Sequence, residues 1–370
     1  ADRRWLLAGN RGRRWLHGVR VHEARILRAG RGNWGGVVSV RACMTPRTAT
    51  IRPEAPIDAN LGNSNGSNGT AGKGVGAGQG IGREALPRLR EAIARVYLGN
   101  PSAIDRLICC LLARGHCLIE DVPGVGKTLL ASALARAIDA PFSRIQLTPD
   151  LLPTDILGVS VYRRDTGEFE FKKGPIFASI VLADEINRAT PRTQTALLEA
   201  MNEAAITVDG RTYPLGQPFM LVATQNPSDF EGTYLLPENQ LDRFLMRVTL
   251  GYPSSEDEAR VLELRPSAAP LHTLTPVLRG AEVVALQEAT DAVRLDRSLV
   301  EYVIALATAT RRHEALQLGL SPRGALALAQ AARATAMLAG RDYVVPEDIL
   351  DNVVGVCAHR VIARDRKSVV

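Results

Sequence analysis

Residues Asp121–Thr128 read DVPGVGKT, and this stretch decides the fold. An apolar run, Cys117–Ile119, precedes it, and an apolar-periodic segment, Leu129–Arg136, follows it, which predicts a strand, a glycine loop and a helix. Small residues let successive backbone N–H groups curl around phosphates, and the helix N-terminus adds partial positive charge. Lys127 can then reach the β and γ phosphates, and the Thr128 hydroxyl can hold Mg²⁺. The stretch therefore predicts a phosphate-binding loop.

One position departs from the usual pattern of such loops, which begins with glycine. This chain has Asp121 there. The position lies at the loop entrance, farthest from Lys127, so we expect it to disturb phosphate binding little. Taken by itself, the stretch has one alternative interpretation, a chance glycine turn before a helix.

Composition limits the classes of protein that the chain can belong to. Its 370 residues, 46% of them hydrophobic, suffice for two or three domains with a real core. It has no apolar run of 18 residues, so no membrane insertion is predicted. The five cysteines lack the paired spacing of a metal site, and we interpret them as reduced thiols of a cytoplasmic protein.

The net charge of +6 is concentrated at the N-terminal end. Residues 1–43 hold ten arginines against Asp2 and Glu23, a charge of +8 that leaves −2 for the remainder. We interpret residues 1–43 as upstream sequence, with Met44 as the true first residue. A basic arm for nucleic acid or an acidic surface is the alternative. Residues 44–85, rich in Pro and then in Gly, Asn and Ser, are predicted to be a flexible tail.

The globular pattern begins near Glu84. Helical patterns occupy Leu86–Arg95 and Pro101–Leu112, and two further apolar runs lie at Ile180–Ala183 and Met220–Ala223. Continuous apolar runs of this length suit strands that are buried on both faces of a parallel sheet. Since helical patterns separate them, residues 86–252 are predicted to form an α/β nucleotide-binding domain.

Beyond Pro253 the strand patterns stop, and residues 253–370 are predicted to form a helical domain. Start signals are clear at Ser321–Pro322 and at Pro346. The predicted helices are Ser255–Arg265, Ala281–Val293, Asp296–Arg312, Ser321–Leu338 and Pro346–Ala363.

Two acids, Asp184 and Glu185, end the Ile180–Ala183 run. Side chains alternate along a strand, so the two acids point in different directions and suit different tasks. The first can hold Mg²⁺, directly or through water, and the second can polarise a water that attacks the γ-phosphate. Two solvated acids at a strand end are the alternative.

Three further polar residues are candidates for the same chemistry. The Asn226 carboxamide could align the attacking water, or it could simply mark the exit of a strand before Pro227. Arg243 lies in a predicted short helix over residues 236–244. It could pair with Asp242 or Glu238, or it could project into a neighbouring subunit, where its planar fork suits phosphate.

Arg323 lies in the first turn of the helix that begins after Ser321. A surface arginine is the plain interpretation of this residue. The alternative is a cation on a mobile helical domain that folds over the nucleotide.

Taken in order, these elements resemble the MoxR family of AAA+ ATPases over about residues 86–365. The resemblance rests on Gly115–Thr128, Lys173–Phe177, Leu182–Ala189, Thr195–Met201, Ala223–Pro227, Leu236–Glu238, Leu241–Phe244 and Ser321–Arg323. It implies a parallel P-loop sheet sandwiched by helices and followed by a small all-α lid.

The resemblance also implies roles for individual residues. Glu185 would be the catalytic base, Asn226 the first sensor, Arg243 an arginine finger acting in trans and Arg323 the second sensor. Thr128 and Asp184 would hold Mg²⁺. The implied nucleotide-binding set comprises Val96, Leu98, Gly99, Pro123, Gly124, Val125, Gly126, Lys127, Thr128 and Arg323.

Three further segments of the chain resemble elements of the family. Val96–Asn100 is similar to the stretch that lines the adenine pocket, although the family more often has Gln at the position of Asn100. Leu151–Lys173 would include an insert in the second helix, and Ala205–Phe219 a hairpin before the first sensor. These last two elements usually face the central pore or the client.

A cytoplasmic, ring-forming ATPase, commonly a hexamer, is what the resemblance implies. Such a protein binds ATP and Mg²⁺ and remodels a protein client in a chaperone-like way, often beside a protein with a von Willebrand A domain. Three alternatives stay open: the AAA+ subunit of a metal chelatase, a nucleotide-gated scaffold without hydrolysis, and a DNA-associated motor. The presence of Glu185 argues against the scaffold, and the −2 charge of residues 44–370 argues against nucleic acid.

Overall fold

The computed structural model describes residues 24–26, 38–40, 84–226, 233–263 and 270–364. The chain divides into two units, Ala1–Ser67 and Asn68–Val370. In the first unit, β1 (Ala24–Ile26) pairs antiparallel with β2 (Val38–Val40). The predictions for residues 1–43 and 44–85 otherwise fall outside the described residues, except at residues 84 and 85, and stay predictions.

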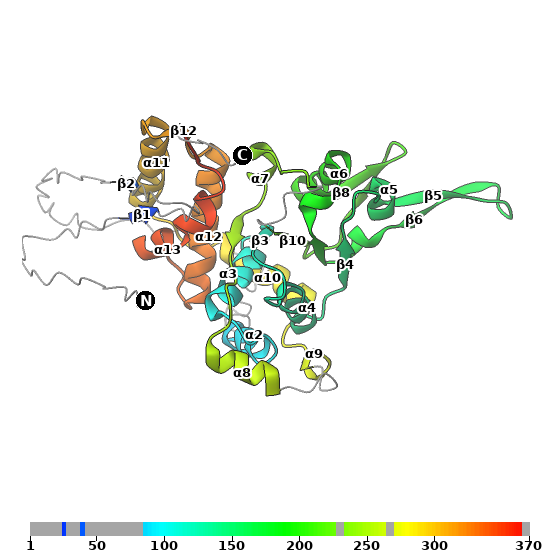
Figure 1. Cartoon of the computed structure of the whole chain (residues 1–370), viewed down its shortest axis with the longest axis horizontal. Helices are drawn as coiled ribbons and strands as arrows, with labels where there is room; N and C mark the ends of the chain where they lie inside the picture. The colour runs from blue at the N-terminus through cyan, green and yellow to red at the C-terminus, as the bar shows by residue number, and fades with distance from the viewer. Residues whose placement is uncertain (1–23, 27–37, 41–83, 227–232, 264–269, 365–370) are drawn as a thin grey trace, which may run out of the picture. The chain divides into compact units, whose positions relative to one another are not determined.

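A five-stranded parallel sheet forms the centre of the second unit (Figure 1). Its spatial order is β11-β3-β10-β7-β4. The strands are β3 (Cys117–Glu120), β4 (Phe142–Gln146), β7 (Ile180–Asp184), β10 (Met220–Gln225) and β11 (Met246–Val248). The three apolar runs of the sequence are thus the three inner strands, which confirms the α/β prediction.

The two outer strands, β4 and β11, are not marked by continuous apolar runs. Arg144 interrupts β4 and Arg247 interrupts β11. An outer strand has a neighbour on one side only, so its exposed positions accept polar side chains. The absence of an apolar run at these two strands has this physical reason.

Helices cover both faces of the sheet. On one face, Leu118, Val181 and Leu221 share a core cluster with Leu197 and Leu198, which lie on α6 (Pro191–Glu203). The alternate residues point to the other face. There α3 (Pro101–Leu112) contacts β11, α4 (Lys127–Ala137) contacts β7 and β4, and α2 (Ala85–Ala94) packs on α3 and α4.

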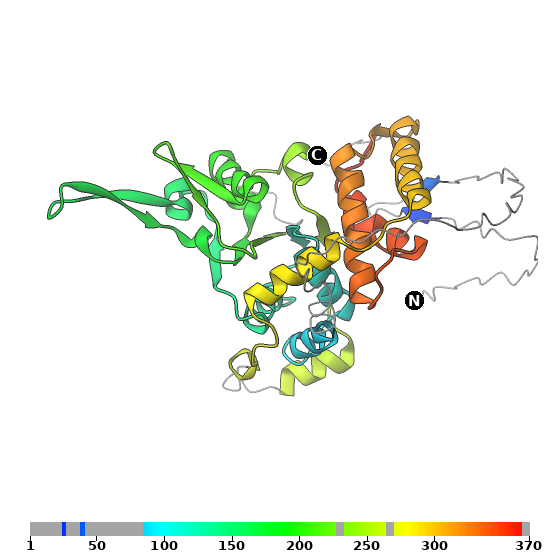
Figure 2. The same ribbon diagram turned by 180° about the vertical axis from the view of Figure 1, so that it is seen from behind.

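Two hairpins extend the structure beyond the sheet. β5 (Gly158–Arg163) pairs with β6 (Glu168–Lys173), and β8 (Ala205–Val208) pairs with β9 (Arg211–Pro214). A short helix, α5 (Pro153–Leu157), precedes the first hairpin. The two views show the β5–β6 hairpin projecting away from the sheet (Figure 1, Figure 2). These hairpins lie in the two segments for which an insert and a hairpin were expected.

The C-terminal part of the chain is mainly helical. Its lid comprises α11 (Arg297–Arg312), α12 (Pro322–Leu338) and α13 (Pro346–Cys357), and α12 packs on both of the others. The connecting helices are α7 (Glu238–Leu241), α8 (Ser255–Glu263), α9 (Pro270–Thr273) and α10 (Gly280–Asp291). None of the described helices combines the length and the apolar character that crossing a bilayer requires.

Two details of the helical part differ from the sequence-based expectation. β12 (Leu316–Leu318) and β13 (Ile362–Ala363) form an antiparallel pair, so strands do not stop at residue 253. The last helix ends at Cys357, before the predicted Ala363, because Ile362–Ala363 pairs with β12. Both strands are too short for an alternating pattern to reveal them.

The buried side chain of His116 joins the start of β3 to α6 and β10. The ring is 6% exposed, with Nε2 2.9 Å from the Met201 carbonyl of α6 and Nδ1 accepting the Leu221 N–H of β10 at 2.9 Å. Both contacts are satisfied by the neutral ring with its hydrogen on Nε2. Burial lowers the pKa of His116 to about 4, against a smaller opposing effect of the Met201 hydrogen bond.

We expect the protein to lose stability as the pH falls. The folded-state pKa of His116 lies below its unfolded value, so acid protonates the unfolded chain first and stabilises it relative to the folded protein. The contribution of His116 to the free energy of unfolding is present above pH 6.5 and is lost toward pH 4. From pH 7.5 to 5.5 the free energy of unfolding should fall by about 1.4 kcal/mol for this residue. Urea unfolding of wild type and His116→Gln should show a smaller pH slope in the variant, and exposed His272→Gln should keep the wild-type slope.

Candidate nucleotide-binding site

The glycine loop joins β3 to α4 at the carboxyl edge of the sheet. Gly124 and Gly126 both have φ near +86°, a left-handed conformation that favours glycine. Gly126 is also the N-cap of α4, which begins at Lys127. Because the first N–H groups of a helix have no partner within it, they point into the loop and suit an anion.

Lys127 lies between the ends of two neighbouring strands. Its Nζ is 2.5 Å from the Asp121 carbonyl oxygen after β3 and 3.3 Å from the Gln225 carbonyl oxygen at the end of β10. The ammonium group is therefore already positioned over the loop, beside the strand that leads to Asn226. Asn226 itself is half-buried and follows β10 directly.

Asp121 has a structural task at the loop entrance. Its Oδ2 accepts the N–H groups of Leu250 and Gly251, both at 2.7 Å, and its Oδ1 accepts the Val122 N–H at 2.8 Å. The side chain is 8% exposed. Asp121 thus fastens the start of the loop to the chain that leaves β11, which explains why an acid replaces the usual glycine.

Tyr97 packs against the loop from the adenine-side segment. A Cβ at Gly126 would lie 3.2 Å from its ring, and a Cβ at Gly99 would lie 2.6 Å from it, so both glycines leave room for the ring. Burial raises the pKa of Tyr97 to about 12, and the negative charge of Asp121 adds to the effect. Val96 is buried beside it, and Leu98 is half-buried. Asn100 caps α3 through the Ser102 N–H, at 3.0 Å.

Thr224 joins the two acids of β7 to the central strand. Its hydroxyl donates to Asp184 Oδ1 at 2.6 Å and accepts the Glu185 N–H at 2.9 Å. The register pairs β10 with both β3 and β7, so the loop and the acids meet at one edge of the sheet. Sequence reasoning missed Thr224, although a hydroxyl two residues before the predicted sensor Asn226 was a visible signal.

The outer strand β4 supplies two more partners of the acids. Arg144 reaches Asp184 Oδ2 through Nη2 at 2.6 Å and through Nε at 3.1 Å. Gln146 donates to Glu185 Oε2 at 3.1 Å, and Arg188 Nε approaches the same oxygen at 3.1 Å. The contacts of Arg144 and Gln146 join residues 39 or 40 positions apart, and no local pattern in the sequence could reveal them.

Glu185 adopts a left-handed backbone conformation, with φ 58° and ψ 52°. For a side chain with a Cβ this costs on the order of 1–2 kcal/mol. Such strain concentrates at functional sites, where the surrounding structure holds it in place. Here the Thr224 hydroxyl and the following turn, Ile186–Arg188, hold it.

The site offers oxygen ligands of the kind that Mg²⁺ prefers. Thr128 is the second residue of α4, and the Asp184 carboxylate lies at the end of β7. Mg²⁺ is usually held by one or two protein oxygens together with substrate phosphates. Within the described residues no group of three or more His, Cys, Asp or Glu is arranged so that it could hold a metal ion. The oxygen donors therefore fit a Mg²⁺ that arrives with a nucleotide, better than an ion in a protein cage.

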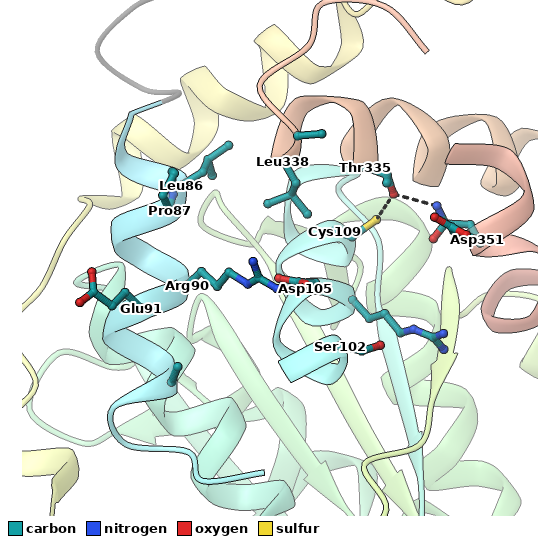
Figure 3. Close-up of a pocket in the computed structure, with 14 residues that line it drawn as sticks. Leu86, Pro87, Arg90, Glu91, Ser102, Asp105, Cys109, Thr335, Leu338 and Asp351 are labelled. Atoms are coloured by element: carbon teal, nitrogen blue, oxygen red, sulfur yellow. Dashed lines mark hydrogen bonds and ion pairs between the residues drawn. The ribbon is translucent and has the colours of Figure 1, made fainter. Parts of the chain in front are cut away.

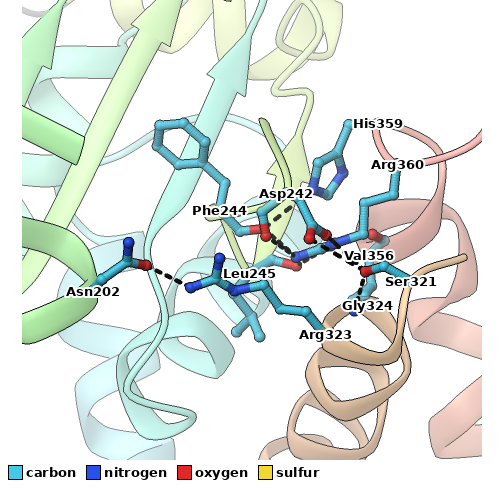
Figure 4. A network of polar contacts seen from close by, with 10 residues as sticks. All are labelled: Asn202, Asp242, Phe244, Leu245, Ser321, Arg323, Gly324, Val356, His359 and Arg360. Carbon is cyan, nitrogen blue, oxygen red and sulfur yellow. Dashed lines mark hydrogen bonds and ion pairs between the residues drawn. The ribbon is translucent and has the colours of Figure 1, made fainter. Parts of the chain in front are cut away.

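The two candidate arginines lie at the opposite edge of the sheet, and Figure 4 shows one of them, Arg323, reaching Asn202. Arg243 Nη1 donates to the Leu198 carbonyl at 2.6 Å, and Arg323 Nη2 donates to Asn202 Oδ1 at 2.5 Å. Leu198 and Asn202 belong to the last turns of α6, next to Met201, which contacts His116 just before β3. Asp242, one of the two acids considered as local partners of Arg243, is paired with Arg360.

Arg323 is therefore not brought to the loop of its own chain. From His116 to Asp121 the strand spans roughly 16 Å at about 3.3 Å per residue. In this structure Arg323 ends on α6, and its role as the second sensor stays a prediction. Sequence alone could not place the lid, since its docking depends on contacts far apart in the chain.

A separate pocket of about 780 Å³ lies between α2 and α3 on one side and α12 and α13 on the other (Figure 3). Arg90 and Asp105, which form an ion pair at 2.6 Å, line it together with Cys109 and Thr335. None of the predicted site residues does so. This pocket is distinct from the nucleotide site.

A glycine loop with two acids and a polar sensor strand at one edge of a parallel sheet defines a P-loop nucleoside triphosphatase. Residues 116–246 match the model of the ATPase family associated with various cellular activities (AAA), and residues 308–369 match the AAA lid domain. The chain is 53% identical over 264 residues to the uncharacterized protein YeaC of Bacillus subtilis, an alignment that covers 71% of this chain and 82% of that protein.

Two further relatives carry a more informative name. Chaperone MoxR1 of Mycobacterium tuberculosis is 41% identical over 78% of each chain, and protein MoxR of Methylorubrum extorquens is 32% identical over 75% of this chain and 88% of that protein. The crystal structure of a proposed ATPase from Cytophaga hutchinsonii superposes with a TM-score of 0.72 at 38% identity, covering 78% of this chain and 90% of that one. The chain belongs to the MoxR family of AAA+ ATPases.

We expect Asp121→Gly, which restores the usual loop sequence, to weaken the protein. The substitution leaves the N–H groups of Leu250 and Gly251 without their acceptor, at a cost of about 2–4 kcal/mol in the free energy of unfolding. Thermal unfolding without nucleotide measures this loss. Exposed Asp165→Gly serves as the matched control and should change stability little. A variant as stable as wild type would contradict the structural task given to Asp121.

Proposed function

We propose that this protein hydrolyses ATP with Mg²⁺, as a ring whose active sites are completed by neighbouring subunits. The observation that carries the proposal is the chain of contacts from Lys127 through β10 to the acids. Lys127 approaches the Gln225 carbonyl, and the adjacent Thr224 contacts both Asp184 and Glu185. A phosphate over the loop would thus lie near a cation, a metal-binding carboxylate and a candidate base.

Each residue has a role that its position supports. Lys127 and the N–H groups from Gly124 to Thr128 bind the phosphates, and Arg144 holds Asp184 in place until the nucleotide arrives. Mg²⁺, held by Thr128 and Asp184, supplies neutralisation of the phosphate charge when it is bound. Glu185 takes the proton of the attacking water, and Asn226 orients that water.

The adenine side is assigned to the segment around Tyr97. Val96, Leu98 and Gly99 line this side, and Pro123 and Val125 complete the loop. The ring of Tyr97 closes the space between the two glycines, which keeps the segment next to the phosphates.

The positions of Arg243 and Arg323 support assembly of subunits. Both lie at the amino edge of the sheet, whereas the loop lies at the carboxyl edge. We assign both arginines to the nucleotide of a neighbouring subunit, where a guanidinium stabilises transition-state charge. Head-to-tail contacts between subunits generate a ring when they close. In a closed ring, the glycine loop of every subunit lies next to the two arginines of a neighbour. A hexamer is the form implied by the family.

A protein client is the partner that the surface supports. The β5–β6 hairpin exposes Phe169 (69%) and Tyr162 (53%), whose ring centroids are 5.3 Å apart. Exposed aromatic groups on a projecting element suit an unfolded peptide. The name of the Mycobacterium tuberculosis relative, a chaperone, supports remodelling of a client. A partner with a von Willebrand A domain and a cytoplasmic location belong to the same proposal, and the buried free cysteines suit a reducing compartment.

We expect ATP turnover to depend on Lys127 and Glu185 in different ways. Lys127→Ala removes the cation and should abolish nucleotide binding, whereas Glu185→Gln should keep binding and lower turnover by at least about 100-fold. Phosphate release and nucleotide titration measure the two properties separately. Full turnover by Glu185→Gln would contradict its role as the base.

Mixing variants tests whether the arginines act across subunits. Arg243→Ala alone should lower turnover by about 1,000-fold. Equal amounts of Arg243→Ala and Glu185→Gln subunits should regain part of the activity, because some interfaces then combine an intact Glu185 with an intact Arg243. Arg247→Ala, on β11, is the control that should not be rescued in this way. Unchanged turnover in Arg243→Ala would refute the trans role.

We expect the hairpin to serve the client and not the chemistry. Tyr162→Ala with Phe169→Ala should leave basal ATP turnover within about twofold and should abolish its change by client, because the aromatic pair lies away from the carboxyl edge. A pull-down with Glu185→Gln supplies the client, and repeating it with the added hairpin substitutions measures retention. Equal capture would contradict the assignment.

A further inference from the structure

Arg360 is a buried guanidinium whose task the ATPase chemistry does not explain. Its side chain is 2% exposed, and it follows α13 at the junction between the lid and β11 (Figure 4). Nε donates to Asp242 Oδ1 at 2.7 Å, and Nη2 donates to the carbonyl oxygens of Asp242 at 3.1 Å and Phe244 at 2.6 Å. Nη1 donates to the carbonyl oxygens of Leu245, at 3.1 Å, and Val356.

These contacts fix the backbone around the arginine finger on both sides. Arg243 lies between Asp242 and Phe244, whose carbonyl oxygens are both held by the same rigid fork. Removing a charge from water is costly, and a buried ion pair is weak evidence of stability by itself. A guanidinium that meets four acceptors in this segment and a fifth at Val356 of α13 specifies one backbone geometry, which an apolar side chain would not do.

Asp242 also contacts the start of α12, the helix that carries Arg323. Ser321 Oγ lies 3.2 Å from Asp242 Oδ2, and it also caps α12 by accepting the Gly324 N–H at 3.0 Å. Arg323 lies between Ser321 and Gly324. A Cβ at Gly324 would come within 2.8 Å of Arg360 Cδ, so the first turn of α12 rests directly on the arginine stem.

The position of Arg243 relative to Arg323 is therefore set by contacts that the two residues share. Both end on α6, at Leu198 and Asn202, which are one helical turn apart and share a face. Their backbones are joined through Asp242, Ser321 and Arg360. The contact of Arg243 with Leu198 is part-buried and that of Arg323 with Asn202 is exposed, so the part-buried contacts of Asp242 are what join the two backbone segments.

We propose that Arg360, through Asp242, is a positioning residue that sets Arg243 and Arg323 as one unit for the nucleotide of the neighbouring subunit. The inference rests on the trans assignment made above and deepens it. Arg360 touches neither nucleotide, and its effect belongs only to the subunit that donates its arginines.

A structural staple would behave differently from a positioning residue. If Arg360 merely kept the lid folded, its loss would harm a ring wherever the variant subunit stood. If it positions the two arginines, its loss harms only the interface to which that subunit gives them. The mixed rings already described separate these cases, since one subunit type donates arginines and the other receives them.

The experiment adds Arg360→Met to one subunit type at a time. In the reference mixture, Glu185→Gln subunits donate arginines and Arg243→Ala subunits receive them. With Arg360→Met in the donor, the regained ATP turnover should fall by at least about tenfold, because a small misplacement near the reacting group is costly. With Arg360→Met in the receiver, the turnover should stay within about twofold. Arg364→Met in the donor is the matched control, since exposed Arg364 also donates to a lid carbonyl, that of Leu316.

Two further measurements decide every outcome. Size-exclusion chromatography shows whether each variant enters the ring, and Asp242→Asn in the donor replaces Arg360→Met if that variant does not fold. A donor-only loss, with kcat reduced at unchanged KM, supports the proposal. Equal losses in both placements, or no loss in the donor, overturn it. A reference mixture without regained turnover refutes the trans assignment itself, which is a separate result.

Discussion

All five strands of the central sheet run parallel, and the remaining architecture depends on this constraint. Parallel strands place all their carboxyl ends at one edge and all their amino ends at the other. The loop, the acids and Asn226 consequently meet at one edge, while the segment of Arg243 enters β11 from the other. With β10 between β3 and β7, one hydroxyl, that of Thr224, can hold both acids next to the strand that approaches Lys127.

The separation of the two edges keeps Lys127 apart from the two candidate arginines within one chain, because Arg243 and Arg323 end on α6 at the other edge. Under the proposed function, the catalytic set of a single chain is therefore incomplete. The lid reinforces the division, because Arg360 and Ser321 anchor it beside Asp242 and not beside the loop. The lid thus contacts the same side of the domain as Arg243 and Arg323.

Local features of the site could be predicted from sequence, and distant ones could not. The loop and the Asp184–Glu185 pair are contiguous, and the three inner strands are continuous apolar runs, so short windows reveal them. Arg144 and Asp184 lie 40 residues apart, and Arg360 and Asp242 lie 118 apart. Such pairs depend on strand order and lid docking, which no single window encodes. Asp121 shows the same limit: its departure from the glycine pattern was visible, but its partners at Leu250 and Gly251 were not.

Helix α6 links the surroundings of Glu185 to the two candidate arginines. It begins shortly after Glu185 and ends at the carbonyl and side chain that hold Arg243 and Arg323. Its 13 residues make a rod of about 20 Å, too short to bend appreciably. A displacement of the turn at Glu185 would therefore arrive at the far end almost undiminished. In the proposed ring, such a rod would pass a change at one nucleotide site to the arginines that the same subunit offers to its neighbour.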